Sequence, residues 1–267
     1  MEKRVLRVGR GLYCPNEQAS VVVDLLGKWQ TLDGAENVFD NRGHHSIIID
    51  EAVDPLSQAL EDAICSMKLE EECDITLTMD TTLATSPMLR EAPHNCVLSY
   101  TIHLVSFVRA PEVWSLSAQN RQTLASQHKA IGTEQFKINN VYGASLHYSK
   151  ALKYVISIDS HTTESDALKK TLYLNLAACQ LKLKQYSNVI KNCNCVLESG
   201  VDDVKALYRR GQALAAMNDF DGAKQDYLKV FELEPNNTAI VKLLRQLEDK
   251  ARAHNSKFRD ALKEMFS

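Results

Sequence analysis

The chain has 267 residues, of which 45% are hydrophobic and 24% are charged, and its formal net charge is −3. These values are typical of a globular protein of one or two domains, and they exclude a strongly basic nucleic-acid binder and an acidic disordered chain. No segment is apolar enough for a membrane helix, and the N-terminal residues lack the apolar stretch of a signal peptide. We therefore expect a cytoplasmic protein, with access to the nucleus left open, that has neither nucleic acid nor a membrane as partner.

The cysteines and histidines form no pattern that predicts a metal site. The seven cysteines are scattered and include no Cys-x-x-Cys pair, so without a secretory signal we expect them to be reduced and mostly buried. His44 and His45 lie in a polar segment, residues 40–46, that is typical of a turn. The sequence also lacks a phosphate loop, a nucleophile elbow and zinc-ligand spacing, so we predict no cofactor, no metal and no catalytic residues.

The first 112 residues are predicted to form a domain of the α+β class. Strand-like patterns occur in residues 3–11, 20–29, 44–50, 73–80 and 96–107. Between the third and fourth patterns, residues 55–71 carry apolar side chains at helical spacing, among them Leu56, Leu60 and Met67. This order predicts an antiparallel sheet with one short helix on it.

Residues 113–267 are predicted to form an all-α array of three repeats. A small residue is followed in each repeat, sixteen positions later, by a larger one: Gly132 by Tyr148, Ala177 by Cys193, and Gly211 by Tyr227. Ala177 and Gly211 are 34 residues apart, the period of the tetratricopeptide repeat. The longer spacing from Gly132 to Ala177 indicates an insertion at residues 157–167.

The repeat boundaries follow from this register. We predict repeats at about 125–165, 170–203 and 204–237, closed by a capping helix at about 238–266. Small residues allow two helices to cross closely, and we expect the aromatic side chains to fill the space toward the next repeat.

The first helices of the three repeats carry polar residues that suit a carboxylate ligand. Lys205 and Arg209 are four residues apart and therefore share one helix face. Lys129 and Asn175 lie in the first helices of the other two repeats, so all four side chains can face one concave groove. Lysine, a bidentate arginine and an asparagine amide are good donors to carboxylates. The alternative is an ordinary solvated surface.

The same segments, residues 128–136, 172–183 and 205–214, resemble the two-carboxylate clamp of repeat domains that bind the C-terminal Glu-Glu-Val-Asp tail of heat-shock protein 90. The family uses Lys, Asn, Asn, Lys and Arg at set positions, which the resemblance assigns to Lys129, Thr133, Asn175, Lys205 and Arg209. Thr133 departs from the common Asn. It can still form a hydrogen bond, but the resemblance implies a weaker grip on the terminal carboxylate.

Residues 4–108 resemble an FKBP domain, the prolyl isomerase fold that precedes clamp-type repeats in immunophilin co-chaperones. The resemblance lies in residues 21–41, 59–77 and 98–107. Active members hold the proline ring in an aromatic pocket, whose floor and wall the resemblance places at Leu60 and Leu25, neither of which is aromatic. The resemblance leaves Phe39, Asp40 and Tyr100 as survivors of the pocket, and of these Phe39 is expected to belong to the core. The family's tyrosine-bearing loop is replaced by the shorter residues 81–95, so the resemblance implies that isomerase activity is absent or vestigial.

The chain as a whole resembles divergent FKBP-type immunophilins with tetratricopeptide repeats, and most closely the FK506-binding-protein-like proteins, with the inactive germline immunophilins as close rivals. The resemblance implies a co-chaperone adaptor whose degenerate FKBP-like domain contacts an unknown client. Two alternatives stay open. One is a working prolyl isomerase with an unusual pocket, and the other is a repeat scaffold for a partner outside the chaperone system.

Overall fold

The structure is a computed structural model that describes residues 1–158, 163–198 and 200–265, the end of the last helix by its backbone alone. The chain divides into two compact units, Met1–Ser117 and Ala118–Ser267. The division falls after a short 3-10 turn, η3 (Val113–Ser115), a few residues beyond the expected boundary at 112.

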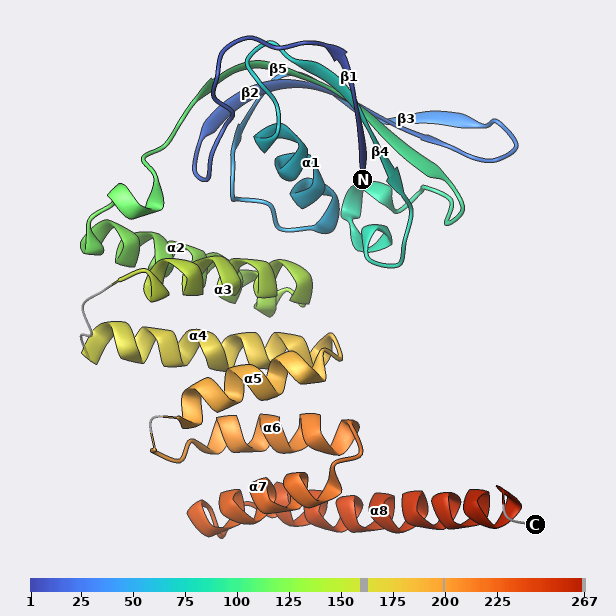
Figure 1. The fold of residues 1–267 in the computed structure, drawn as a ribbon, viewed down its shortest axis with the longest axis vertical. Helices are drawn as coiled ribbons and strands as arrows, with labels where there is room; N and C mark the ends of the chain where they lie inside the picture. Colours follow the sequence, from blue (N-terminus) through green and yellow to red (C-terminus); the bar gives the residue numbers. More distant parts are fainter. Residues whose placement is uncertain (159–162, 199, 266–267) are drawn as a thin grey trace. The chain divides into compact units, whose positions relative to one another are not determined.

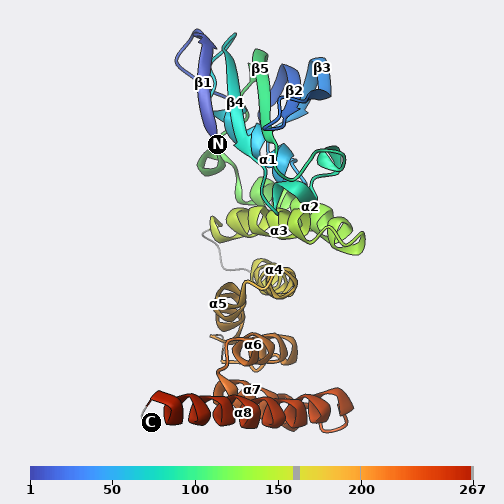
Figure 2. The ribbon, with the colours of Figure 1, turned by 90° about the vertical axis from the view of Figure 1, so that its right-hand side faces the viewer.

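The first unit is an antiparallel sheet with one α-helix on its inner face (Figure 1). Its strands are β1 (Glu2–Arg7), β2 (Ser20–Gln30), β3 (Glu36–Ile48), β4 (Glu72–Thr78) and β5 (Val97–Val108). Figure 2 shows the spatial order β1-β4-β5-β2-β3, in which β1 and β3 are the edges. Every second residue in the first part of β2 and in most of β5 is buried, because successive strand residues face opposite sides. The predicted α+β fold is confirmed.

Helix α1 (Pro55–Cys65) begins with a side-chain cap. The Asp54 carboxylate accepts hydrogen bonds from the backbone N–H groups of Leu56 (3.1 Å) and Ser57 (3.3 Å), and proline takes the first helical position. Leu56, Leu60 and Ile64, spaced by four residues, are buried in the core of this unit. The helix ends before Met67, which is buried just beyond it.

The expectation of a turn at residues 40–46 was wrong, because β3 runs through this segment. The pairing of β2 with β3 shifts register between Val23 and Leu25, and His44 adopts φ 48°. The Asp24 carboxylate accepts the His44 amide at 2.7 Å. A β-bulge thus absorbs an extra residue within a continuous strand, although its polar composition is also typical of a turn.

The second unit is a stack of antiparallel helix pairs (Figure 1). In the described residues the pairs are α2 (Ala118–Lys137) with α3 (Val141–Ile156), α4 (Thr163–Lys182) with α5 (Tyr186–Leu197), and α6 (Val204–Ala216) with α7 (Phe220–Leu233), followed by α8 (Thr238–Met265). The predicted array of three pairs and a closing helix is therefore confirmed. Residues 159–162, within the predicted insertion, and residue 266 of the predicted capping helix lie outside the described residues.

Glycine is required where the helices of a pair cross. A Cβ atom on Gly132 would lie 2.9 Å from the ring of Tyr148, and one on Gly211 would lie 2.5 Å from the ring of Tyr227. Each ring packs against the glycine of its own repeat. The aromatic side chains are expected to fill the space toward the next repeat, but Tyr148 and Tyr227 also pack within their own repeat. The reason is that the second helix of each pair runs antiparallel to the first helix and places its ring against it.

All seven cysteines are free thiols. Cys73, Cys96, Cys179 and Cys193 are buried, whereas Cys195 is exposed. Burial raises the pKa of the Cys179 thiol to about 11 and that of Cys193 to about 12, so these thiols are protonated and unreactive at neutral pH.

Candidate functional site

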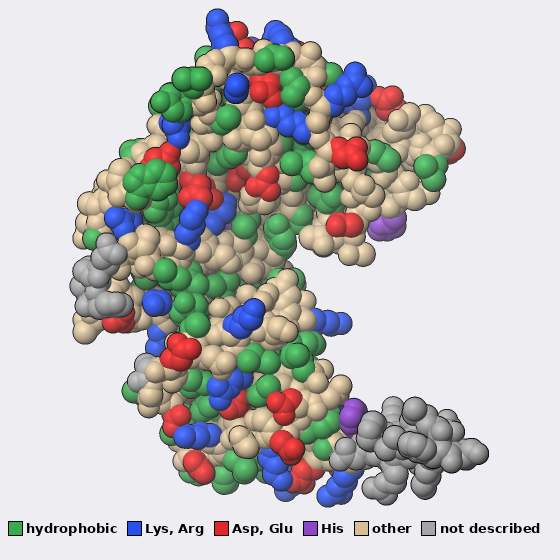
Figure 3. All heavy atoms as spheres, in the orientation of Figure 1, with side chains coloured by type: hydrophobic (Ala, Val, Ile, Leu, Met, Phe, Trp, Pro, Cys, Tyr) green, Lys and Arg blue, Asp and Glu red, His purple; other side chains and the backbone are tan. Residues whose placement is uncertain are grey.

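A cavity of about 380 Å³ lies on the helical array, against the first helices of its three pairs. Its lining comprises Phe136, Ala178, Leu181, Lys182, Val204, Lys205, Tyr208, Arg209, Gln212 and Asn237. Two of the predicted clamp residues, Lys205 and Arg209, line it together, whereas the other three lie outside this lining. Basic and apolar side chains lie next to one another over this unit in Figure 3, so the array offers both charge and apolar contact.

The guanidinium of Arg209 is anchored across two helices. Its Nη1 atom donates to the backbone carbonyl of Leu174 at 2.9 Å, which fixes α6 against α4. Leu174 directly precedes Asn175, so this bond also brings the guanidinium to the backbone beside the predicted asparagine. Burial lowers the pKa of Arg209, but a guanidinium remains charged at neutral pH. Among the described residues its other N–H donors have no partner, so they are available to a ligand.

Three of the predicted clamp residues, Lys129, Asn175 and Lys205, have side chains without a partner among the described residues. Lys205 is exposed and Lys129 is half-buried, and within the residues that the structure describes neither forms an ion pair. In the same residues the side-chain amide of Asn175 has no hydrogen-bond partner. Positive charge that no protein carboxylate neutralises attracts an anionic ligand.

Thr133 differs from the other four residues because its hydroxyl is already used. It donates to the backbone carbonyl of Lys129 at 2.8 Å and accepts from the Tyr148 hydroxyl at 3.2 Å. A threonine hydroxyl has one hydrogen to donate, so in this arrangement Thr133 has none left for a carboxylate.

Further lining residues were missed by the sequence analysis, although a signal for them exists. Three of them each follow a predicted clamp residue by seven positions: Phe136 after Lys129, Lys182 after Asn175, and Gln212 after Lys205. Seven residues are about two helical turns, so each pair shares a face. Lys182 lies 4.6 Å from the centre of the Phe136 ring and donates to the Asn139 side chain at 3.1 Å. It adds a third cation to the cavity.

The residues predicted to be a remnant of the isomerase pocket lie in the core of the first unit. Leu25 is 2% exposed, Leu60 5% and Tyr100 0%, and the half-buried Phe39 packs against them. The rings of Phe39 and Tyr100 meet edge to face with their centroids 5.4 Å apart. These side chains therefore take part in the core packing of the unit.

Asp40 lies at the centre of a buried polar network. It accepts from the Tyr100 hydroxyl at 2.9 Å and from two nitrogens of Arg42 at 2.8 and 2.6 Å. Burial, reinforced by the neighbouring Asp40 charge, raises the pKa of Tyr100. Arg42 was missed by the sequence analysis, although it follows Asp40 by two residues in a regularly paired part of β3 and therefore lies on the same face of the strand.

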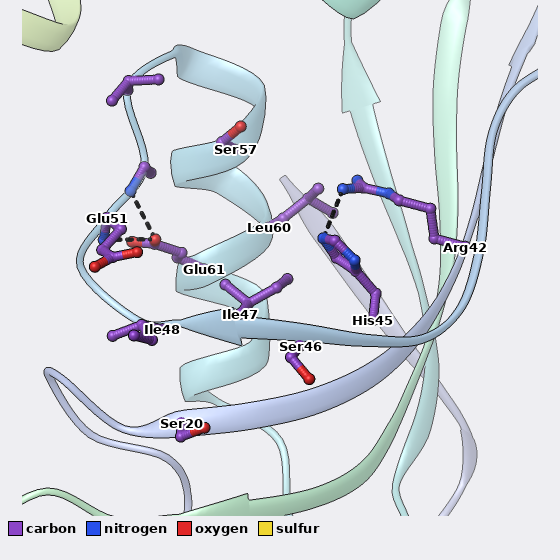
Figure 4. A pocket seen from close by; sticks show the side chains of 12 residues that line it. Ser20, Arg42, His45, Ser46, Ile47, Ile48, Glu51, Ser57, Leu60 and Glu61 are labelled. Carbon is purple, nitrogen blue, oxygen red and sulfur yellow. Dashed lines mark hydrogen bonds between the residues drawn. The ribbon is translucent and has the colours of Figure 1, made fainter.

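A hollow of the first unit lies beside this network (Figure 4). It measures about 530 Å³ and is bounded by β3, α1 and the segment between them. Of the predicted pocket residues only Leu60 lines it.

No described helix has the length and apolarity needed to cross a membrane. Within the same residues, no three side chains from histidine, cysteine, aspartate and glutamate are grouped so that they could hold a metal ion.

The fold combines a sheet-and-helix unit with an array of antiparallel helix pairs, and the array carries a cavity lined by Lys182, Lys205 and Arg209. A tetratricopeptide repeat model matches residues 204–237, the third predicted repeat. The chain is 34% identical over 269 residues to the peptidyl-prolyl cis-trans isomerase FKBP4 of Bos taurus, an alignment that covers 99% of the chain and 58% of the relative. It is 34% identical over 166 residues to the FK506-binding protein-like protein of Mus musculus, covering 62% of the chain and 47% of that relative.

A solved structure extends the likeness to the helical array. The C-terminal repeat-containing domain of a putative FK506-binding protein from Plasmodium falciparum matches with 27% identity and a TM-score of 0.50, covering 54% of this chain and 99% of that one. The chain is therefore a homologue of the FKBP-type immunophilins that carry tetratricopeptide repeats. It spans less than two thirds of the length of the curated relatives that it matches.

Proposed function

We propose that this chain is a co-chaperone adaptor whose helical array binds the C-terminal Glu-Glu-Val-Asp tail of heat-shock protein 90, and whose FKBP-like unit contacts a client without isomerase activity. The observation that carries the first part is the pair Lys205 and Arg209, which line one cavity, while Arg209 also bonds the backbone carbonyl of Leu174, the residue before Asn175. Calorimetric titration with a Met-Glu-Glu-Val-Asp peptide tests it. We expect a dissociation constant in the micromolar range, which corresponds to a binding free energy of roughly −8 kcal/mol.

The C-terminal residue of such a tail carries two carboxylates, one on its side chain and one on the main chain. Arg209 is held in place by its bond to Leu174, so it loses little conformational freedom when a carboxylate binds. Lys205 and Lys129 supply further positive charge, and the Asn175 amide supplies a neutral donor. Charge-assisted hydrogen bonds of this kind are the stronger ones in proteins.

The structure makes a specific prediction for Thr133. Because its hydroxyl hydrogen is donated to the Lys129 carbonyl, Thr133→Ala is expected to change the peptide dissociation constant by less than about twofold. Asn175→Ala is expected to weaken binding about tenfold, since it removes a hydrogen bond of roughly 1.4 kcal/mol to a charged group. Calorimetry on the two variants checks this contrast, and a large effect of Thr133→Ala would show that the hydroxyl turns to the ligand.

The proposed loss of isomerase activity rests on packing. Burying an aromatic ring against a proline contributes a few kcal/mol, and the positions assigned to the floor and wall are leucines that are already covered. Asp40, the polar residue that remains, is held by Arg42 and Tyr100. The unit therefore keeps the fold of its isomerase relatives while its former pocket stabilises its own core.

A direct assay tests this part. We expect the chain to leave the cis-trans exchange rate of an Ala-Leu-Pro-Phe peptide at its uncatalysed value, measured by NMR exchange without a coupling protease, with an active FKBP domain as positive control. Acceleration by the wild-type chain that is lost in Leu60→Asp would contradict the proposal and favour the working isomerase.

A further inference from the structure

The 530 Å³ hollow of the first unit lies along a free strand edge (Figure 4). Strand β3 is the last strand of the sheet, so one row of its backbone N–H and C=O groups has no strand partner. His45 and Ile47 alternate along this strand with Ser46 and Ile48, and all four line the hollow. Since residues of both strand faces line it, the hollow follows the edge of β3, where an added strand would pair.

One end of the hollow offers hydrogen-bond donors without net charge. Arg42 is neutralised by its two bonds to Asp40, and its Nη1 atom lies 3.0 Å from Nε2 of His45. Because a guanidinium only donates, Nε2 of His45 accepts, and its Nδ1 carries the hydrogen. This end suits the carbonyl oxygen of a peptide.

The middle of the hollow is apolar. Leu60 extends from α1 and Ile47 from β3 in Figure 4, and both side chains line the hollow. An apolar side chain of a bound strand would be covered on two sides here.

The other end of the hollow carries two acidic residues, Glu61 and Glu51, whose side chains differ in their contacts. The Glu61 carboxylate is buried and accepts the backbone N–H groups of Glu51 (3.0 Å) and Ala52 (2.8 Å). The Glu51 carboxylate lines the hollow, is exposed and has no partner in the described residues. The preceding residue, Asp50, adopts φ 89°, a conformation that side-chain-bearing residues rarely take and that concentrates at functional sites.

We propose that this hollow binds an extended segment of a partner protein that pairs with the edge of β3 and carries an apolar residue two positions from a lysine or arginine. Residues two apart in a strand share a face, so the apolar side chain would lie against Leu60 while the cation reaches Glu51. The carbonyl groups near the other end would accept from Arg42 and His45. The proposal rests on the client contact proposed above for the FKBP-like unit and names the segment it would bind, and it is independent of chaperone-tail binding by the helical array.

The test is an NMR titration of the ¹⁵N-labelled full chain. The probes are acetyl-Ala-Leu-Ala-Lys-Ala-amide and acetyl-Ala-Lys-Ala-Leu-Ala-amide, which cover both strand directions, and the same peptides with norleucine in place of lysine. One of the lysine peptides is expected to shift the amides of residues 45–53 with a dissociation constant of about 1 mM or tighter. Its norleucine analogue is expected to bind roughly three- to tenfold more weakly.

Glu51→Gln is the informative variant, because it keeps the side-chain size and breaks no bond in the described residues. It is expected to abolish the preference for lysine over norleucine, whereas Glu2→Gln, an exposed acidic residue on the opposite edge strand, leaves it unchanged. The proposal is overturned if neither lysine peptide shifts residues 45–53 at about 5 mM, if the preference survives in Glu51→Gln, or if acetyl-Ala-Leu-Pro-Phe-amide binds there more tightly than both lysine peptides. Adding Met-Glu-Glu-Val-Asp to the same sample reports separately on the helical array, so failure of one site is distinguished from failure of the other.

Discussion

Replacing Lys205 by glutamate is expected to weaken the binding of a Met-Glu-Glu-Val-Asp peptide about a hundredfold. Lys205 lines the same cavity as Arg209, is exposed, and forms no ion pair with any described residue. The substitution removes a charge-assisted hydrogen bond to a peptide carboxylate and adds a charge that repels it. The side chain takes no part in helix packing, so the array should stay folded.

Lys191→Glu is the matched control, since it makes the same change in net charge at an exposed position of α5 away from the cavity. We expect its peptide affinity to stay within about twofold of the wild type. Arg209 is less suitable for charge reversal, because a carboxylate there would face the Leu174 carbonyl that Arg209 now binds. Calorimetry measures the peptide affinity of both lysine variants, and circular dichroism checks that both are folded. Unchanged affinity in Lys205→Glu would place the peptide elsewhere.

Asp40→Ala is expected to lower the free energy of unfolding of the first unit by about 3 kcal/mol. The Asp40 side chain is 3% exposed and bonds both Tyr100 and Arg42. Its removal leaves the Tyr100 hydroxyl without an acceptor in a fully buried site, and it leaves Arg42 without its counter-charge. Because the Arg42 side chain is 33% exposed, water partly compensates that charge, and we place the effect at the lower end for a buried pair.

Urea unfolding followed by tryptophan fluorescence measures this effect. Trp29 packs against the core of the first unit, whereas Trp114 is 78% exposed, so the fluorescence change reports mainly on that unit. Tyr100→Phe, which removes one hydrogen bond, is expected to cost about 1 kcal/mol, and the exposed Asp62→Ala on α1 less than about 0.5 kcal/mol. If Asp40→Ala is as stable as Asp62→Ala, the network has no structural role, and Asp40 is better explained as a remnant of the isomerase site.

Much of the fold was accessible from the sequence because its periodicities are simple. The alternation in β2 and β5, the four-residue spacing of Leu56, Leu60 and Ile64, and the 34-residue repeat each reflect one geometric period. The bulge at His44 was not accessible. The polar composition of this segment is equally typical of a turn. The sequence does not show that the Asp24 carboxylate on the neighbouring strand accepts the backbone N–H of His44 in the bulge.

The sites show a similar limit. The spacing of Lys205 and Arg209 fixes that they share a helix face, but it does not say that Arg209 bonds the carbonyl of Leu174 on another helix. Nor does the spacing show that the Thr133 hydroxyl donates its hydrogen to the Lys129 carbonyl of its own helix. Such bonds depend on side-chain rotamers and on the distance between helices, which no single-chain pattern encodes. Lys182 and Phe136 could have been found, because they follow predicted residues by two helical turns.

The proposed function rests on recognition of carboxylates at a chain end, and one pair of titrations tests this most directly. Met-Glu-Glu-Val-Asp with a free C-terminus and the same peptide with an amidated C-terminus would be titrated calorimetrically into the full chain. We predict one-to-one binding of the free peptide in the micromolar range, weakened by salt, and binding of the amidated peptide at least about tenfold weaker. Equal affinity for the two peptides, or no binding of the free one, would contradict the clamp.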